Sequence, residues 1–199
     1  MRPPDIPGWQ LGDELGRGGF ATVWEGRRGD ERAAIKVSRL GTAAARLRFA
    51  REAEAMRRVR APAAPALFDA GEQAGLPYLV MERIGGETLA ALLASRTSPP
   101  SLPWVRAIAS AMVARIAAVH RAGLVHADIK PGNLRVDPAG PDVRLLDFGL
   151  AVPPGAGGVI GGTPRYAAPE QIRGETVAPA TDVYGFGLIL YEMLAGRSP

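Results

Sequence analysis

The chain has 199 residues and a formal net charge of +4, and 47% of its residues are hydrophobic, which is typical of a globular domain. It contains no cysteine and only two histidines, which excludes disulfides, thiolate metal sites and cysteine nucleophiles and argues against a multi-histidine metal centre. The densest basic run, residues 51–60, alternates with glutamate, so we expect a solvated helix face there and no nucleic-acid partner.

The first part of the chain reads as strands and one helix. Residues 10–38 contain two strand-like segments, the turn "RRGDER" and the short apolar run "AAIKVS". A helix rich in Ala, Arg and Glu is predicted over residues 42–60 and ends at "APAAP". Two further strands, residues 66–72 and 76–82, are expected to join around Gly75. The glycine break "RIGGET" is the candidate boundary between this part and the remainder.

The remainder reads as mainly helical. "TLAALLAS" is a short helix, and residues 103–121 form a longer one. The longer helix has an apolar stripe at helical spacing, formed by Val105, Ile108, Met112, Ile116 and Val119. We predict a hairpin over residues 134–146, a loop without hydroxyl side chains over residues 150–162, and a nearly all-apolar helix over residues 181–196. No apolar run reaches the roughly 18 residues of a membrane span.

A lysine and a glutamate are expected to form an ion pair. Lys36 lies within the apolar run "AAIKVS", where an unpaired charge would be costly to bury. Glu52 shares one face of the predicted helix with Phe49 and Met56, because these residues are three or four positions apart. The alternative is that the two are unrelated surface charges.

The first glycine-rich segment is a candidate phosphate-binding loop. Gly16, Gly18 and Gly19 lie between two predicted strands, where backbone amides can approach an anion without obstruction by a Cβ atom. A flexible hairpin tip would have the same composition.

The segment "HADIKPGN" combines rare residues. It contains Lys130, one of two lysines in the chain, and Asn133, the single asparagine. Asp128 and Asn133, together with Asp147 in "LLDFG", supply oxygen ligands of the kind that Mg²⁺ prefers. The predicted hairpin, residues 134–146, lies between Asn133 and Asp147 and would bring these two residues together at its open end. With Asp128 as a base and Lys130 as a cation, the set suits phosphoryl transfer, which needs positioning and charge neutralisation.

Seven segments follow one another in the order of the protein-kinase motifs and resemble most the bacterial eukaryotic-type (Hanks-type) Ser/Thr kinases. They are "GRGGFATV", "AIK", Glu52, "HADIKPGN", "DFG", "GTPRYAAPE" and "TDVYGFG". The resemblance implies an α+β bilobal fold. Residues 1–84 would form a β-rich N-terminal lobe with one long helix, and residues 85–199 a mainly helical, truncated C-terminal lobe.

The resemblance also implies catalytic residues and a magnesium site. Lys36, paired with Glu52, would hold the α- and β-phosphates of ATP. Asp128 would accept the proton of the substrate hydroxyl, and Lys130 would steady the γ-phosphate. The implied magnesium ligands are Asn133 and Asp147. Lys130 followed by proline resembles the Ser/Thr-specific pattern.

The implied adenine site lies between the two lobes. The base would lie between Val23 and Ala34 above and Leu134 below, with hydrogen bonds to the backbone of Glu82 and Ile84. The phosphate loop would contribute Gly16, Gly18 and Gly19.

Three further residues have supporting roles in the family pattern. His126 would be a packing residue, and Asp182 would bind the backbone of the catalytic loop. Thr163 would contact the catalytic Asp and Lys. His120 is expected to be an ordinary residue at a helix C-terminus.

The sequence departs from the family pattern in its phosphate loop and its regulatory segment. Ala21 replaces the third glycine of the loop, which should be tolerated if its φ is negative. Ala127 replaces the arginine that normally gathers a phosphate on the activation segment, and residues 150–162 contain no hydroxyl to be phosphorylated. We therefore expect an enzyme that phosphorylation of this segment does not switch on.

The resemblance to the family ends with the predicted helix over residues 181–196. In the family, further helices follow this one. An all-round apolar helix is normally buried, so we expect an exposed apolar patch that could support self-association. We expect an ATP- and Mg²⁺-dependent kinase in the cytoplasm that acts on Ser/Thr of a protein. The alternatives are a non-catalytic kinase-like nucleotide-binding or scaffold module and a small-molecule kinase such as an aminoglycoside phosphotransferase.

Overall fold

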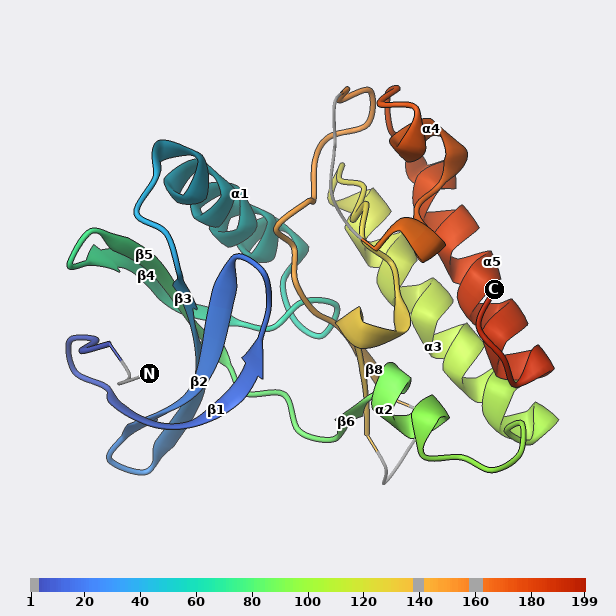
Figure 1. Ribbon diagram of the computed structural model, residues 1–199, viewed down its shortest axis with the longest axis horizontal. Helices are drawn as coiled ribbons and strands as arrows, with labels where there is room; N and C mark the ends of the chain where they lie inside the picture. Colours follow the sequence, from blue (N-terminus) through green and yellow to red (C-terminus); the bar gives the residue numbers. More distant parts are fainter. Residues whose placement is uncertain (1–3, 138–141, 158–162) are drawn as a thin grey trace.

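The computed structural model describes residues 4–137, 142–157 and 163–199. Its two parts lie side by side: a twisted sheet with one helix on it, and a mainly helical part with a small sheet (Figure 1). This is the bilobal α+β arrangement that the sequence predicts.

The first part is built on a five-stranded antiparallel sheet in the order β1-β2-β3-β5-β4. Two of its turns have two residues, because Arg28 pairs with Glu31 and Gln73 pairs with Leu76. The second turn, Ala74 and Gly75, has positive φ at both positions, as the tight hairpins that match strand twist require. The strands are Gln10–Arg17 (β1), Ala21–Arg28 (β2), Glu31–Ser38 (β3), Leu67–Gln73 (β4) and Leu76–Glu82 (β5).

Helix α1, Ala43–Val59, covers one face of this sheet. Thr42 caps it, since its hydroxyl accepts a hydrogen bond from the backbone N–H of Ala45 at 3.2 Å. The predicted face is buried and includes Phe49, Glu52 and Met56. A carboxylate therefore lies in the interior, as the helical spacing predicts.

The second part contains a helical body and a three-stranded sheet in the order β6-β7-β8. Strand β6 lies within the glycine break "RIGGET", where the sequence suggests only a boundary; tertiary pairing with β7 stabilises a strand that is too short to recognise from its composition. The helices are Leu89–Ala94 (α2), Leu102–Arg121 (α3), Pro169–Ile172 (α4) and Pro179–Ala195 (α5), and the strands are Glu87–Thr88 (β6), Leu134–Val136 (β7) and Val143–Leu145 (β8). Pro131–Asn133 (η1) and Pro164–Tyr166 (η2) are short 3₁₀ helices.

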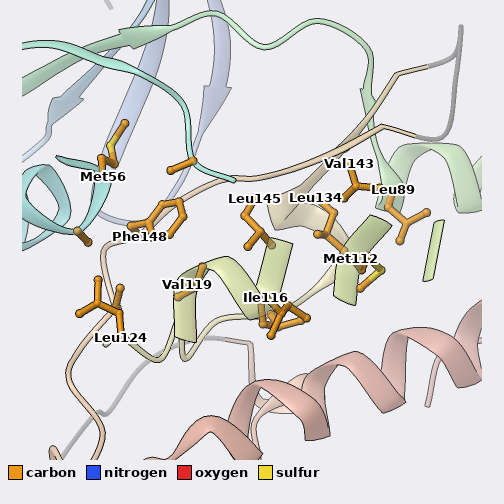
Figure 2. Packing of buried hydrophobic residues seen from close by; sticks show 14 of the residues in the cluster. Met56, Leu89, Met112, Ile116, Val119, Leu124, Leu134, Val143, Leu145 and Phe148 are labelled. Atoms are coloured by element: carbon orange, nitrogen blue, oxygen red, sulfur yellow. The ribbon is translucent and has the colours of Figure 1, made fainter. Parts of the chain in front are cut away.

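One hydrophobic core joins the two parts. Figure 2 shows Met56 of α1 on one side of Phe148, and residues of α3, β7 and β8 on the other. Phe148 is fully buried, as are Leu134 and Leu145. Because the same cluster includes residues of both parts, the two parts pack against each other through a shared core.

Helix α3 is long and apolar enough to cross a bilayer by length and composition alone. All five residues of its predicted stripe, from Val105 to Val119, are buried in the core. One of its charged residues also has a partner within the fold, since Arg115 pairs with Asp142 at 2.5 Å. The apolar stripe of this helix therefore packs into the core that the two parts share.

Helix α5 is apolar on several faces, as predicted, and only one face is covered. Gly185, Ile189 and Met193 are buried, whereas Val183 and Leu194 are 57% and 51% exposed. The buried face approaches the segment that contains Ile129 closely, because a Cβ atom on Gly185 would lie 2.8 Å from the carbonyl oxygen of Ile129.

We predict opposite effects of alanine at the two glycines of α5. Gly185→Ala has no room for its methyl group and should lower the free energy of unfolding by about 1–3 kcal/mol. Gly187→Ala meets no atom within 4 Å and should raise it by roughly 0.5–1 kcal/mol through helix propensity. Thermal and urea unfolding would measure both. Equal effects of the two substitutions would contradict the close packing of α5 against Ile129.

Candidate active site

A cavity of about 470 Å³ opens between the two parts of the molecule. The β1–β2 turn, β3 and α1 line it from the first part, and the segments after β5 and around η1 and β8 line it from the second. It brings together residues that the sequence singled out from six separate segments: Gly16, Gly18, Gly19, Val23, Ala34, Lys36, Glu52, Glu82, Ile84, Asn133 and Asp147. A cavity of this size and mixed polarity suits a small organic ligand with an anionic group.

The expectation for Leu134 is wrong in its orientation. Leu134 is fully buried in the core instead of lining the cavity, while its neighbour Arg135 lines it together with Leu146. Successive side chains of a strand point to opposite faces, so one position decides which residue faces the cavity. Arg135 also donates a hydrogen bond to the carbonyl oxygen of Gly86, which fixes its head group at the cavity mouth.

Gly18 and Gly19 form the turn between β1 and β2, as predicted, whereas Gly16 lies within β1, opposite Val23. Gly18 donates its backbone N–H to the carbonyl oxygen of Ala21 at 2.9 Å, closing the turn. Ala21 does not have a positive φ, so replacement of a glycine there is tolerated as expected. No atom lies within 4 Å of a Cβ atom built on Gly16 or Gly19, which leaves the backbone open to a ligand.

An ion cluster centred on Lys36 lies deep in the cavity. Its ammonium group is 2.7 Å and 2.8 Å from the two carboxylate oxygens of Glu52, and 2.9 Å from Oδ1 of Asp147. The side chains of Lys36 and Glu52 are 12% and 2% exposed. The predicted ion pair is therefore present, and Asp147, more than a hundred positions away in the sequence, completes it.

The charges of this cluster depend on one another. Burial alone would lower the pKa of Lys36, but the carboxylates of Glu52 and Asp147 outweigh burial and raise it above its ordinary value. Burial raises the pKa of Glu52, and Lys36 offsets this only in part. Burial also opposes ionisation of Asp147, yet the Lys36 ammonium holds its pKa well below its usual range. Lys36 and Asp147 are accordingly charged at neutral pH.

Asp128 is held by two donors from its own loop. Nζ of Lys130 lies 2.9 Å from its Oδ2 atom, and Nδ2 of Asn133 lies 2.8 Å from the same atom. Asn133 also donates to the backbone carbonyl oxygen of Asp128 at 2.9 Å. Among the residues that the structure describes, no hydrogen bond occupies Oδ1 of Asp128, which leaves it free to accept a proton.

Asn133 and Asp147 each keep an oxygen that suits a divalent cation. The amide nitrogen of Asn133 makes both of its hydrogen bonds, so its Oδ1 atom remains. Asp147 binds Lys36 and the N–H of Gly149 through Oδ1, so its Oδ2 atom remains. No group of three or more His, Cys, Asp or Glu residues with metal-binding spacing occurs in the described part of the chain. Two protein oxygens fit Mg²⁺, which commonly takes its other ligands from phosphate and water.

A buried carboxylate, Asp182 of α5, supports the loop that carries Asp128. Its two oxygens accept the backbone N–H groups of His126 and Ala127, each at 2.9 Å. Ala127 has a φ of +60°, a conformation that costs a non-glycine residue energy unless its surroundings enforce it. These hydrogen bonds confirm the expected contact of Asp182 with the loop backbone.

His126 and His120 are both structural, but in different ways. His126 is fully buried and packs on Phe148 with a ring separation of 4.8 Å, as the resemblance implies. His120 is more than a residue at a helix end, because its Nε2 atom lies 2.8 Å from Oδ2 of Asp182. Its partner is 62 positions away in the sequence, so helix position alone could not indicate it.

Arg48 and Phe20 form a contact across the cavity mouth that the sequence analysis missed. The Arg48 guanidinium lies 4.7 Å from the ring centroid of Phe20 at the tip of the glycine turn. A Cβ atom on Gly149 would lie 2.9 Å from Nε of Arg48. Arg48 is one helical turn before Glu52, and this spacing could have placed it on the side of α1 that faces the cavity.

Comparison with known proteins agrees with this geometry. A family model described as the protein kinase domain matches residues 9–199. The serine/threonine-protein kinase PknL of Mycobacterium tuberculosis is 41% identical over 196 residues, which cover 94% of this chain and 49% of that protein. The serine/threonine-protein kinase pkn2 of Myxococcus xanthus is 37% identical over 205 residues, 93% of this chain and 24% of that protein. The chain thus spans about half the length of the mycobacterial relative and less of the other.

We predict that Asp182→Asn destabilises the protein by about 1–3 kcal/mol, because an amide cannot accept all three hydrogen bonds of the buried carboxylate. Asp142→Asn is a matched control at a half-exposed ion pair and should cost no more than about 1 kcal/mol. Chemical unfolding followed by circular dichroism would compare the two. If the control lost as much stability as Asp182→Asn, the support of the loop by Asp182 would be contradicted.

Proposed function

The chain belongs to the protein kinase domain family, among relatives named serine/threonine-protein kinases, and on that premise we propose that it transfers the γ-phosphoryl group of ATP to Ser or Thr hydroxyls of a protein substrate. One observation carries the proposal: Lys36 binds Glu52 and Asp147 together, inside a cavity that is also lined by Asn133, the hydrogen-bond partner of Asp128. Kinases require this lysine–glutamate pair and a metal-binding aspartate to be in place at the same time.

In this proposal, cationic and oxygen-bearing side chains have separate roles in binding the nucleotide. Lys36 holds the α- and β-phosphates and stays oriented by Glu52. The bound Mg²⁺, with Asn133 and Asp147 as protein ligands, would supply neutralisation of the phosphate charge. Adenine would contact Val23 and Ala34, with hydrogen bonds to the backbone at Glu82 and Ile84, all of which line the cavity.

Asp128 acts on the substrate hydroxyl. Its Oδ2 atom is held by Lys130 and Asn133, so its Oδ1 atom can accept the hydroxyl proton as the oxygen attacks the γ-phosphorus. The bond from that phosphorus to the bridging oxygen of the β-phosphate breaks, and ADP is the leaving group. Lys130 can then exchange its contact with Asp128 for the transferring phosphoryl group. Positioned proton transfer of this kind is worth about 10²- to 10⁴-fold in rate.

We further propose that this kinase is not switched on by phosphorylation of the segment after Asp147. Residues 158–162 of that segment lie outside the described residues. The part up to Gly157 makes backbone hydrogen bonds that need no phosphate: Val152 pairs with Val125, and Gly155 and Ala156 bond with Val177. The Nε2 group of Gln171 also donates to the carbonyl oxygen of Ala127 at 2.8 Å, which holds the residue that replaces the family's phosphate-gathering arginine.

The lobe boundary and the compartment are parts of the same proposal. We place the division of the lobes after Ile84, so that residues 1–84 and 85–199 close on the nucleotide from opposite sides. The absence of cysteine and the need for ATP fit the cytoplasm.

We predict that Asp128→Asn abolishes transfer to protein, with a loss of at least about 100-fold, because the amide cannot accept the hydroxyl proton. Affinity for Mg–ATP should stay within about threefold, because the Lys36 cluster is untouched. Radiolabelled ATP with a generic protein substrate measures the first effect, and calorimetry measures the second.

The same pair of measurements separates the alternatives. Mg–ATP binding without transfer by the unaltered chain would favour a non-catalytic nucleotide-binding module. Transfer to a small molecule but to no protein would favour a small-molecule kinase. Full activity of Asp128→Asn would contradict the role of Asp128.

We also predict that the active protein carries no stoichiometric phosphate on Thr163. The substitution Thr163→Ala does not test this prediction cleanly. Thr163 lines a small hollow together with Asp128, so its removal also alters the surroundings of the catalytic carboxylate. Intact-mass spectrometry and peptide mapping of active protein give the answer directly, and full occupancy at Thr163 in the active form would sink the proposal of phosphorylation-independent activity.

A further inference from the structure

A second hollow of about 520 Å³ lies beside the catalytic loop. Its walls are the loop after α2, the segment Lys130–Gly132, the residues around η2, and the end of α5. Gly132 lines both this hollow and the nucleotide cavity. A chain bound here would therefore pass the loop that carries Asp128.

The charges of this hollow are strongly one-sided. Four cations line it, Arg96, Lys130, Arg165 and Arg197, against one acid, Glu192. This excess of three charges compares with a formal net charge of +4 for the entire chain. We name the hollow, defined by these five residues, the cationic groove.

The single acid of the cationic groove is already engaged. Oε2 of Glu192 accepts a hydrogen bond from the hydroxyl of Tyr166 at 2.6 Å. Lys130 has a partner in Asp128, but Arg96, Arg165 and Arg197 make no ion pair with a carboxylate within the described ranges. Three exposed guanidinium groups are thus available to an incoming anion.

The groove has a fixed shape around these groups. Arg96 stacks on Trp104 with 4.7 Å between the guanidinium and the ring centroid. The wall beside it contains Pro99, and a Cβ atom on Gly196 would lie 2.9 Å from the Cγ atom of Pro99. The loop after α2 and the end of α5, at the lower right of Figure 1, therefore form one wall. The Arg96 guanidinium is thus held in place, and guanidinium groups bind carboxylates well because they form two parallel hydrogen bonds with them.

We propose that the cationic groove selects acidic protein substrates, by binding Asp or Glu side chains that flank the phosphoacceptor Ser or Thr. The inference rests on the proposed kinase function, because it assigns the substrate class to that same site. Basic flanking residues would meet three unpaired guanidinium groups and be repelled, so the groove gives both attraction and exclusion.

The test uses three peptides with one central threonine and the same backbone length. The flanking residues are glutamate in the first, glutamine in the second and lysine in the third. We expect kcat/KM for the glutamate peptide to exceed that for the glutamine peptide by at least about tenfold and the lysine peptide to be the poorest; the first ratio should fall as salt is raised. Equal rates for the three peptides, or preference for lysine, would overturn the inference.

Charge reversal in the groove should reverse the preference. Arg96→Glu with Arg165→Glu should lower kcat/KM for the glutamate peptide at least tenfold and raise it for the lysine peptide, with the KM for ATP unchanged. Arg57→Glu with Arg121→Glu is the matched control, since these arginines are also exposed but lie outside the groove. If Arg57→Glu with Arg121→Glu changed the peptide preference as much as the groove variant does, net charge would explain the effect. The groove would then have no role in selecting the peptide.

Binding of the labelled peptides, followed by fluorescence anisotropy, separates this inference from the proposed function. Tighter binding of the glutamate peptide that disappears in Arg96→Glu with Arg165→Glu supports the groove even if no phosphoryl transfer is seen. Transfer to all three peptides without any difference in binding or rate overturns the groove but leaves the kinase function intact.

Discussion

The buried ion cluster of Lys36, Glu52 and Asp147 is the constraint on which the rest of the structure depends. Removing three charges from water is costly, and only their close mutual contacts offset the cost. The three residues come from β3, α1 and the segment after β8. The sheet, its helix and the helical part must therefore dock in one arrangement, and that arrangement forms the nucleotide cavity. Met56 and Phe148 belong to the apolar core that joins the two parts, so apolar burial and charge pairing favour the same docking.

A second polar cluster fixes the opposite side of the site. Asp182 binds the backbone of the catalytic loop from a helix that is otherwise apolar, and Gly185 lets that helix approach Ile129. The loop can then keep Ala127 in a left-handed conformation. Asp128 thus owes its orientation to groups on both sides: Lys130 and Asn133 within the loop, and Asp182 below it. The same loop lies between the nucleotide cavity and the cationic groove. In the proposed reaction, ATP in the cavity and a protein substrate in the groove would therefore meet at Asp128.

The sequence was sufficient to predict a residue's position where that position depends on a local pattern. Helical spacing placed Glu52 on the buried face of α1, and the cost of an isolated charge in an apolar strand made Lys36 its partner. The ordered motifs singled out Asp128, Asn133 and Asp147; in the structure Asn133 and Asp147 line the cavity, and Asn133 hydrogen-bonds Asp128. Prediction failed where the outcome depends on tertiary contacts or on one position of register. Strand alternation turned Leu134 into the core and Arg135 toward the cavity, and His120 meets Asp182 only because α3 and α5 pack together. The cations of the cationic groove come from separate segments, so no local sequence pattern could predict the groove.

The most direct test of this account is a double-mutant cycle on Mg–ATP affinity with Lys36→Met, Glu52→Gln and the double variant, measured by calorimetry. If Glu52 acts by orienting Lys36, its substitution should weaken binding in the unaltered protein but have little further effect once Lys36 is gone. The coupling should then reach at least about tenfold in Kd, or about 1.4 kcal/mol. Strictly additive effects of the two substitutions would show that the pair does not act as a unit, and would contradict the account.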